Sequence, residues 1–344
     1  MTYLINRHVT TTLAAVITAV GVLSQPVAAA PYFEGKTIIV QVPSGSGGTY
    51  HVYCQIVQRN IGRHIPGQPK TVIQNRPGGG GAKSAAYMAK VAPKNGSVIA
   101  MIAPGTITTP LVRNVKFNAR EFNWLGAVAA RSSGIWMWHT SGITTLQQLK
   151  DKQTTIATTG FSSGGSVVPR MINSLLGTKM KLIYGYKGGG ALNLSVEREE
   201  TQGRWNFRSG FTGVRPTWLP QKKVVAVIAT GPRDPLMKGV PHLRDMLKDG
   251  SVEQKMYDVI GMNFEVGQAF YVPPGTPKKI VAILTKAFAD MIADPRTKAD
   301  ILKRGIEFSP KSAKEIRTEI AKGFDAVTPE VLKGLKGIYT KKKS

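Results

Sequence analysis

The sequence has a single cysteine, Cys54, in 344 residues. One cysteine excludes a disulfide within the chain, and it excludes a metal site built from several thiolates. Cys54 lies in a stretch with helical apolar spacing, so we interpret it as a small buried side chain, with a catalytic thiol as the alternative. The five histidines show no metal-ligand spacing, and His139 and His242 are interpreted as ordinary surface or loop residues. No metal and no cofactor are therefore expected.

Acidic residues are also scarce, with 20 Asp and Glu against 46 Lys and Arg, giving a formal net charge of +26. Such a charge can attract nucleic acid, anionic lipid or small anions. The basic residues are spread along the chain, and the longest run is Lys341–Lys343 at the end. We expect small anions as partners and no nucleic acid. The alternatives are a charge that serves only solubility and a basic surface-interaction protein.

No apolar run is long enough for a membrane span. The longest early run, Thr10–Leu23, follows Arg7 and precedes the small residues Ala28–Ala30. A positive start, a short apolar run and small residues at a cleavage site are typical of a secretory signal peptide. We therefore predict a cleaved signal peptide over residues 1–29 and a mature protein in a bacterial periplasm.

Glycine, by contrast, is abundant and is concentrated in loops. Residues 37–54 begin as a β-rich apolar run, break at Pro43 into a glycine-rich loop, and continue with helical apolar spacing. A strand, a glycine loop and a helix N-terminus together form an anion site, because free N–H groups and the helix dipole both favour negative charge. The residues that we expect to contact a ligand here are Ser44, Gly45, Ser46, Gly47, Gly48, Thr49, Tyr50 and His51.

The same pattern recurs at loops that start at Thr159 and Tyr186. In an open α/β sheet the loops that follow the strands meet at one edge, so the three loops are predicted to converge. Arg208 is a further candidate donor, with a surface position as the alternative. The additional predicted ligand contacts are Gly160, Phe161, Ser162, Ser163, Gly164, Gly165, Ser166, Tyr186, Lys187 and Gly188.

Three segments resemble enzyme motifs, but none of them matches its motif. The Gly45–Tyr50 segment lacks the third glycine of a dinucleotide-binding loop. The Gly78–Ser84 segment departs from a Walker A loop, since Pro77 and Ala82 stand where glycine is needed. Ser163 does not lie in the G-x-S-x-G pattern of hydrolases. An exported serine hydrolase that uses Ser163 or Ser166 with a histidine remains as the alternative hypothesis.

The order of elements predicts two α/β domains. Residues 30–130 and 131–229 each repeat the strand, glycine loop and helix pattern, and residues 230–344 return to the first domain. We expect a strand over Val266–Val272, followed by helices over 278–292, 295–304 and 313–322. Two crossings between the domains would form a hinge, with the ligand site in the cleft.

These motifs together resemble the Bug-type (TctC-like) periplasmic receptors, which are the substrate-binding proteins of tripartite tricarboxylate transporters. The resemblance covers the whole mature chain. It is carried by the first glycine loop and by the segments Phe33–Ile38, Gly62–Gly67, Val72–Gly81, Ala92–Gly96, Trp124–Gly126, Tyr186–Gly188 and Pro273–Pro277.

The resemblance implies a fold and a function. The fold would be a two-domain periplasmic binding protein that closes on its ligand like a Venus flytrap. The ligand would be a small dicarboxylate, tricarboxylate or aromatic acid, held by backbone amides of loops 44–51 and 160–166, with 186–188 beside them. The resemblance further implies a non-enzymatic, monomeric receptor that delivers its ligand to permease subunits, and a sensor without a permease is the alternative.

One departure from the family concerns the position after the first glycine loop. The family commonly has an acid there, and this chain has Tyr50-His51. A histidine removes a negative charge and adds a positive one when it is protonated. We therefore expect a more purely anionic ligand than some relatives take.

Overall fold

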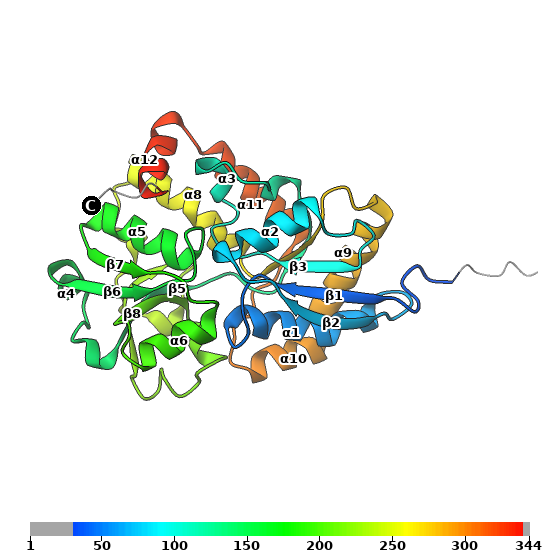
Figure 1. Cartoon of the computed structure of the whole chain (residues 1–344), viewed down its shortest axis with the longest axis horizontal. Coiled ribbons are helices and arrows are strands. Elements are labelled where there is room, and N and C mark those ends of the chain that lie inside the picture. The colour runs from blue at the N-terminus through cyan, green and yellow to red at the C-terminus, as the bar shows by residue number, and fades with distance from the viewer. Residues whose placement is uncertain (1–29, 340–344) are drawn as a thin grey trace, which may run out of the picture.

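The structure, a computed structural model, describes residues 30–339. The predicted signal peptide lies outside the described residues. Two β-sheets lie in separate lobes, with sheet A at the right of Figure 1 and sheet B at the left. Helices cover both sheets, so the two-sheet α/β architecture expected from the sequence is confirmed.

Sheet A has the strand order β11-β4-β10-β3-β1-β2. Strand β1 pairs in parallel with β2 and β3, whereas β10 is antiparallel to β3 and β4. Its first strand, Thr37–Val42, is buried over most of its length, as the apolar run predicts. The strands are β1 Thr37–Val42, β2 Lys70–Asn75, β3 Val98–Met101, β4 Asn123–Ala127, β10 Ala269–Val272 and β11 Lys311–Ser312.

Sheet B has the order β7-β6-β8-β5-β9 and is also mixed. Strand β6 is parallel to β7 and β8, and β5 is antiparallel to β8 and β9. All five strands come from one continuous part of the chain. They are β5 Ser133–Trp138, β6 Gln153–Ala157, β7 Lys179–Ile183, β8 Gly203–Phe207 and β9 Val224–Thr230.

The helices pack against the sheets through buried apolar faces. Helices α1, α9 and α10 bury theirs in one core with β1, and Cys54 of α1 is fully buried there, as expected. A second core is continuous from sheet A to sheet B. The helices are α1 Thr49–Ile61, α2 Ala82–Lys90, α3 Thr109–Val112, α4 Leu146–Asp151, α5 Gly164–Leu176, α6 Gly189–Glu197, α7 Ser209–Thr212, α8 Val252–Val266, α9 Lys278–Ala293, α10 Pro295–Lys303, α11 Ala313–Asp325 and α12 Pro329–Tyr339.

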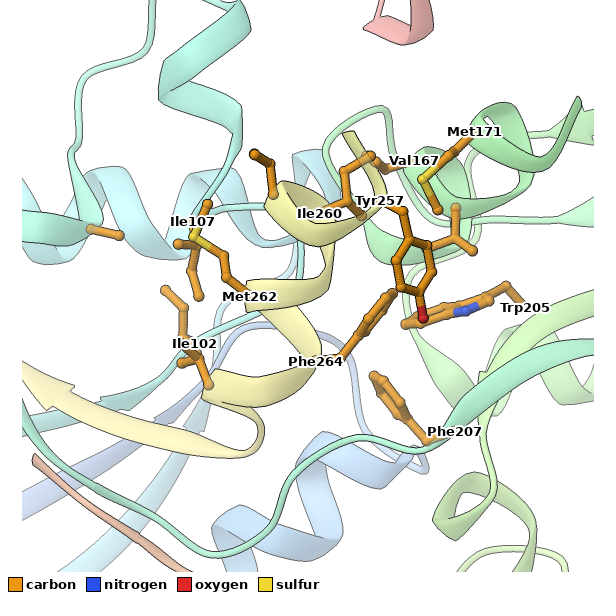
Figure 2. Packing of buried hydrophobic residues seen from close by; sticks show 14 of the residues in the cluster. Ile102, Ile107, Val167, Met171, Trp205, Phe207, Tyr257, Ile260, Met262 and Phe264 are labelled. Carbon is orange, nitrogen blue, oxygen red and sulfur yellow. The ribbon is translucent and has the colours of Figure 1, made fainter. Parts of the chain in front are cut away.

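One predicted strand begins later than expected. The strand expected over Val266–Val272 begins only at Ala269, because α8 continues to Val266 and Gly267 follows with φ +67°. Helix α8 is buried on several sides, which obscures its helical periodicity in the sequence. Phe264 of α8 points toward Trp205 and Phe207 of sheet B (Figure 2). This helix therefore joins the cores of the two lobes.

The two chain crossings between the sheets lie side by side. Gln268 N donates to Ala129 O at 2.7 Å, and Arg131 N donates to Phe264 O at 3.0 Å. The Arg131 side chain is fully buried, and its guanidinium donates to the Asn263 and Ile102 carbonyls. The crossings are therefore tied to each other by backbone hydrogen bonds and by one buried cation.

No helix among residues 30–339 combines the length and the apolar character needed to span a bilayer.

Asp294 joins α10 to the end of α1, and its removal should make stability depend less on pH. Its carboxylate caps α10 through Arg296 N and accepts from Arg63 Nη2 at 2.7 Å. Hydrogen bonds from Arg296 and Arg63 hold the pKa of Asp294 below its usual value of 3.8. A carboxylate whose pKa is lowered by folding stabilises the fold above pH 3.8. This stabilisation is lost as the pH falls below that value and the carboxylate is protonated.

We therefore expect Asp294→Asn to lower the urea midpoint at pH 7, with a difference from the unmodified protein that shrinks below about pH 4. Asp290→Asn is the control, because Asp290 makes an exposed pair with Lys286 on α9. A difference that stays constant down to pH 2 would contradict this account.

Candidate ligand-binding site

A cavity of about 380 Å³ lies between the two lobes. This volume is in the usual range for small-molecule sites. Its walls come from both sheets and contain no aspartate or glutamate. The lining residues are Pro43, Ser44, Gly48, Thr49, Tyr50, Pro77, Gly78, Gly79, Gly80, Gly81, Thr158, Thr159, Ser163, Gly164, Gly165, Gly185, Tyr186, Lys187, Gly188, Gly189, Leu192, Arg204, Trp205, Asn206 and Phe207.

Four helices begin at this cavity. The N-cap residues of α1, α2, α5 and α6 are Gly48, Gly81, Ser163 and Gly188, and all four line it. None of these caps places a side-chain hydrogen bond on the helix, and none of the four first turns contains an acid. The first N–H groups of a helix have no partner within it, and the dipole adds partial positive charge. The cavity therefore has positive potential from four helix starts, although at α2 the preceding turn already takes one donor, since Lys83 N donates to Gly78 O at 3.4 Å.

Arg204 adds a full positive charge from β8. It is 6% exposed and donates to Asn193 Oδ1, Gly189 O and Asn206 Oδ1, at 2.6, 3.0 and 3.1 Å. None of these partners is a carboxylate. Burial lowers the pKa of Arg204 to about 9, so the guanidinium stays charged at neutral pH. A buried cation without an anionic partner favours a negatively charged ligand.

The two lobes meet through backbone beside the cavity. Gly45 N donates to Lys187 O at 2.9 Å. A Cβ on Gly48 would lie 2.9 Å from Gly189 Cα, and one on Gly80 would lie 2.4 Å from Ser163 N. Only glycine allows such close approach. The cleft is thus closed by main-chain contacts that leave no space for side chains.

Many of the predicted contact residues line the cavity, although their contact with a ligand stays a prediction. The convergence of the three glycine loops is the feature that brings them together. These residues are Ser44, Gly48, Thr49, Tyr50, Ser163, Gly164, Gly165, Tyr186, Lys187 and Gly188.

Other predicted residues support the loops from outside the lining. The Phe161 ring lies against two guanidinium groups, with Arg170 at 3.8 Å and Arg113 at 4.7 Å from its ring centre. The Ser166 hydroxyl pairs with Tyr184 Oη at 3.1 Å. Also outside the lining are Gly45, Ser46, Gly47, Gly160 and Ser162, which lie in the loops where the lobes meet.

His51 is held away from the cavity lining by Asn75. His51 Nδ1 lies 3.2 Å from Asn75 Nδ2, and the same amide donates to Ser44 O at 2.8 Å. Burial lowers the pKa of His51, and the Asn75 hydrogen bond only partly opposes this. The positive charge expected of His51 at mildly acid pH is therefore disfavoured, because a half-buried imidazole is costly to charge.

Arg208 is not among the residues that line the cavity. Its guanidinium pairs with Asp234 and lies 3.7 Å from Glu307 Oε1. Burial raises the pKa of Glu307, while the charge of Arg208 opposes the rise. With two carboxylates beside it, Arg208 is placed to link sheet B to the C-terminal part of sheet A. Sequence reasoning had no means of finding these partners, which lie far away in the chain.

Two parts of the lining were not assigned to the site by the sequence analysis. The loop Gly78–Gly81 was considered only as a possible Walker A loop, yet it connects β2 to α2 in the same way as the predicted loops. That shared pattern was the signal that could have placed it in the site. Arg204 and the adjacent Trp205–Phe207 segment end strand β8, and only the three-dimensional position of β8 places them in the cleft.

The serine residues proposed for a hydrolase have other partners. Ser163 Oγ donates to Gly160 O at 2.7 Å and lies 2.9 Å from Thr158 Oγ1, while Ser166 pairs with Tyr184. Neither hydroxyl is paired with a histidine in the described part of the chain. This geometry gives the hydrolase hypothesis no support. Within residues 30–339, no group of His, Cys, Asp and Glu side chains could hold a metal ion.

Solved structures with the same arrangement are periplasmic binding proteins. BugD superimposes with a TM-score of 0.69 and 17% identity, over 88% of this chain and 97% of that protein. The chain has the periplasmic binding protein fold. MatC from Rhodopseudomonas palustris, with bound malate, gives a TM-score of 0.65 and 17% identity, over 89% of this chain and 99% of MatC.

The R. palustris protein Rpa4515, with adipate, also shares this periplasmic binding protein fold. Its TM-score is 0.65 at 17% identity, over 85% of this chain and 96% of Rpa4515. No family model and no curated protein sequence matched the chain. The fold is therefore shared at sequence identities that do not carry a ligand from one protein to the other.

Proposed function

We propose that this protein is a periplasmic solute-binding receptor of the Bug type, which captures a small carboxylate in the cleft between its lobes. One observation carries the proposal. Four uncapped helix N-termini and the buried Arg204 surround a cavity whose lining has no acidic residue. Such a cavity attracts anions and repels cations.

Relatives of the same fold support a carboxylate rather than another anion. The solved structures of MatC and Rpa4515 contain malate and adipate. Both ligands are dicarboxylates of a size that suits a cavity of about 380 Å³. We extend this ligand class to the present chain.

The available donors are sufficient for useful affinity. A hydrogen bond to a charged group contributes about 1.5–3 kcal/mol. Several such bonds, less the cost of ordering the ligand and closing the lobes, can reach the roughly −8 kcal/mol of micromolar binding. Because most donors are backbone amides, the affinity depends mainly on the closed arrangement of the loops.

The receptor is proposed to work as a monomer without catalytic activity, and to deliver its ligand to the membrane subunits of a tripartite tricarboxylate-type permease. A sensor without a permease is the alternative use of the same site. A transport receptor and a sensor would bind the ligand in the same way. They would differ only in the protein that contacts the closed, ligand-bound form.

Titration calorimetry on the mature protein, freed of bound ligand by partial unfolding and refolding, tests the binding step. We expect at least one organic acid to bind with a Kd of about 1 μM or lower, and organic cations of similar size to show no binding. Native mass spectrometry of the purified protein would identify any acid that co-purifies. A folded, ligand-free protein that binds no organic acid would refute the proposal.

A further inference from the structure

The basic residues in the middle of the chain lack acidic partners. Residues 70–187 contain 15 lysines and arginines but only two acids, Glu121 and Asp151. Within the described part of the chain, none of these 15 residues forms an ion pair, and the paired cations all lie before Lys70 or after Lys187. The positive field of this region is therefore not neutralised by the protein itself.

Two of these cations, one from each lobe, lie against the ring of Phe161. Arg113 follows α3 and is exposed, and its guanidinium lies 4.7 Å from the ring centre. Arg170 of α5 is half-buried and lies 3.8 Å from the same ring. Helix α12 packs against both α3 and α5 (Figure 1). The ring therefore joins a cation of the sheet A lobe to a cation of the sheet B lobe.

The Arg170 guanidinium is fixed in place but is not neutralised. It donates to Phe161 O at 3.0 Å and to Ser166 O at 3.1 Å. Its Nη1 is buried and has no partner within residues 30–339. Burial lowers the pKa of Arg170, and the charge of Arg113 lowers it as well. The two cations therefore repel each other, and the described residues supply no counter-charge between them.

This pair of cations depends on closure of the cleft. The loop that carries Phe161 touches the other lobe through backbone, since a Cβ on Gly105 would lie 2.2 Å from Ser162 O. When the cleft opens, Arg113 moves with one lobe and Arg170 with the other. An anionic group beside both guanidinium groups relieves their repulsion and so favours closure. By linkage, closure strengthens the binding of that group by the same factor.

We propose that an acidic protein segment docks at this place and recognises the closed form by contacting both lobes. The docking surface consists of Arg113, Phe161, Arg170 and Tyr184. This inference concerns a partner of the closed form and does not depend on which ligand the cleft takes.

The chemistry of the docking surface favours a protein as the partner. An arginine fork binds a carboxylate of Asp or Glu through two hydrogen bonds, and a ring that holds the guanidinium reduces the freedom lost on binding. Tyr184 is 42% exposed and pairs with Ser166, whose carbonyl accepts from Arg170. Arginine and tyrosine are both enriched in interfaces between proteins. An anionic bilayer instead attracts clusters of basic residues through their summed charge.

Fluorescence anisotropy with fluorescein-labelled hexa-aspartate tests the docking surface, in about 100 mM salt to weaken long-range attraction. We expect Arg113→Gln to weaken binding by about threefold or more, because a two-hydrogen-bond contact is lost. Arg113 lies outside the cavity lining, so this loss does not report on the cleft. Lys279→Gln on α9 is the control, since Lys279 is exposed, is unpaired within residues 30–339 and carries the same charge. Equal effects of the two variants, or no binding by the unmodified protein, would overturn the proposal.

Gly48→Ala tests whether docking requires the closed cleft. Gly48 lies away from the docking surface, where an added Cβ would lie 2.9 Å from Gly189 Cα of the other lobe. We expect this variant to weaken hexa-aspartate binding by about threefold or more. Gly261→Ala should bind like the unmodified protein, because its added Cβ meets nothing within 4 Å. Full peptide affinity in Gly48→Ala would overturn recognition of the closed form.

Vesicles of phosphatidylcholine and phosphatidylglycerol in equal parts provide the comparison with a membrane. We expect Arg113→Gln and Lys279→Gln to reduce co-sedimentation with these vesicles equally, because a bilayer responds to total charge. A selective loss for Arg113→Gln on vesicles, without one on hexa-aspartate, would assign the surface to a membrane and overturn the proposal. None of these measurements needs the ligand of the cleft, so a failure to bind organic acids would refute the proposed function alone.

Discussion

Gly160→Ala is expected to weaken ligand binding by roughly 10- to 100-fold while the protein stays folded. An added Cβ at this position would lie 2.6 Å from Gly80 N and 2.8 Å from the Gly79 carbonyl carbon. These atoms belong to the other lobe, so the collision exists only when the cleft is closed. The φ angle of Gly160 is not in the left-handed region, and alanine can adopt it without strain. The substitution therefore acts on closure and not on folding.

Gly48→Ala makes the same test where the start of α1 meets the start of α6. Gly48 has φ −123°, which any residue can adopt, and its added Cβ would lie 2.9 Å from Gly189 Cα. We expect a similar loss of affinity, measured by calorimetry with the acid that the unmodified protein binds most tightly. The control is Gly261→Ala on α8, where the added Cβ meets nothing within 4 Å.

The control should bind like the unmodified protein. If Gly160→Ala and Gly48→Ala also kept full affinity, the contact between the lobes would not be part of the bound state. A circular dichroism spectrum and a urea midpoint for each variant separate a failure to close from a failure to fold.

Gly267→Ala is expected to destabilise the protein by about 2–6 kcal/mol. Gly267 ends α8 at the second crossing with φ +67° and ψ −146°, a conformation that is almost restricted to glycine and costs about 1–3 kcal/mol for a residue with a Cβ. The added Cβ would also lie 2.0 Å from Ala129 O of the first crossing, which is backbone and cannot move aside cheaply. Overpacking of this kind adds about 1–3 kcal/mol.

Gly239→Ala separates these two costs. Gly239 has φ +86°, but an added Cβ there meets nothing within 4 Å. We expect Gly239→Ala to lower the free energy of unfolding by only about 1–2 kcal/mol, the cost of the positive φ, as measured by urea denaturation followed by fluorescence. Equal losses in the two variants would mean that the crossings relax around the new methyl group, and that their close pairing does not contribute to stability.

The sequence predicted that its glycine loops would converge, because the local pattern that makes such a loop is visible in the sequence. A strand, a glycine loop and a helix start leave a local signal, and the loops at Ser44, Thr159 and Tyr186 all lie at the cavity. Strand β8, Gly203–Phe207, also contributes to the lining. What the pattern could not supply was the place of β8 next to the cleft, because strand order depends on contacts between distant segments.

The errors have the same origin. Arg208 looked like a free donor because its partners, Asp234 and Glu307, are distant in sequence. Arg204 looked like any strand residue until its neighbours showed a buried charge without a carboxylate. Helix α8 was not predicted because it is buried on several sides. Such burial removes the apolar spacing of three to four residues on which helix prediction depends.

The uncapped helix starts have a consequence for how this protein can change over evolutionary time. A main-chain N–H is present with every side chain except proline, so most single replacements at these four helix starts leave the backbone donors in place. The rings of Tyr50, Trp205 and Phe207 have no such protection. Outside the glycines at which the two lobes touch, mutational drift would therefore change the preference among the proposed acids more readily than it would abolish their binding, and a gene duplicate could acquire a new ligand by altering a few wall residues.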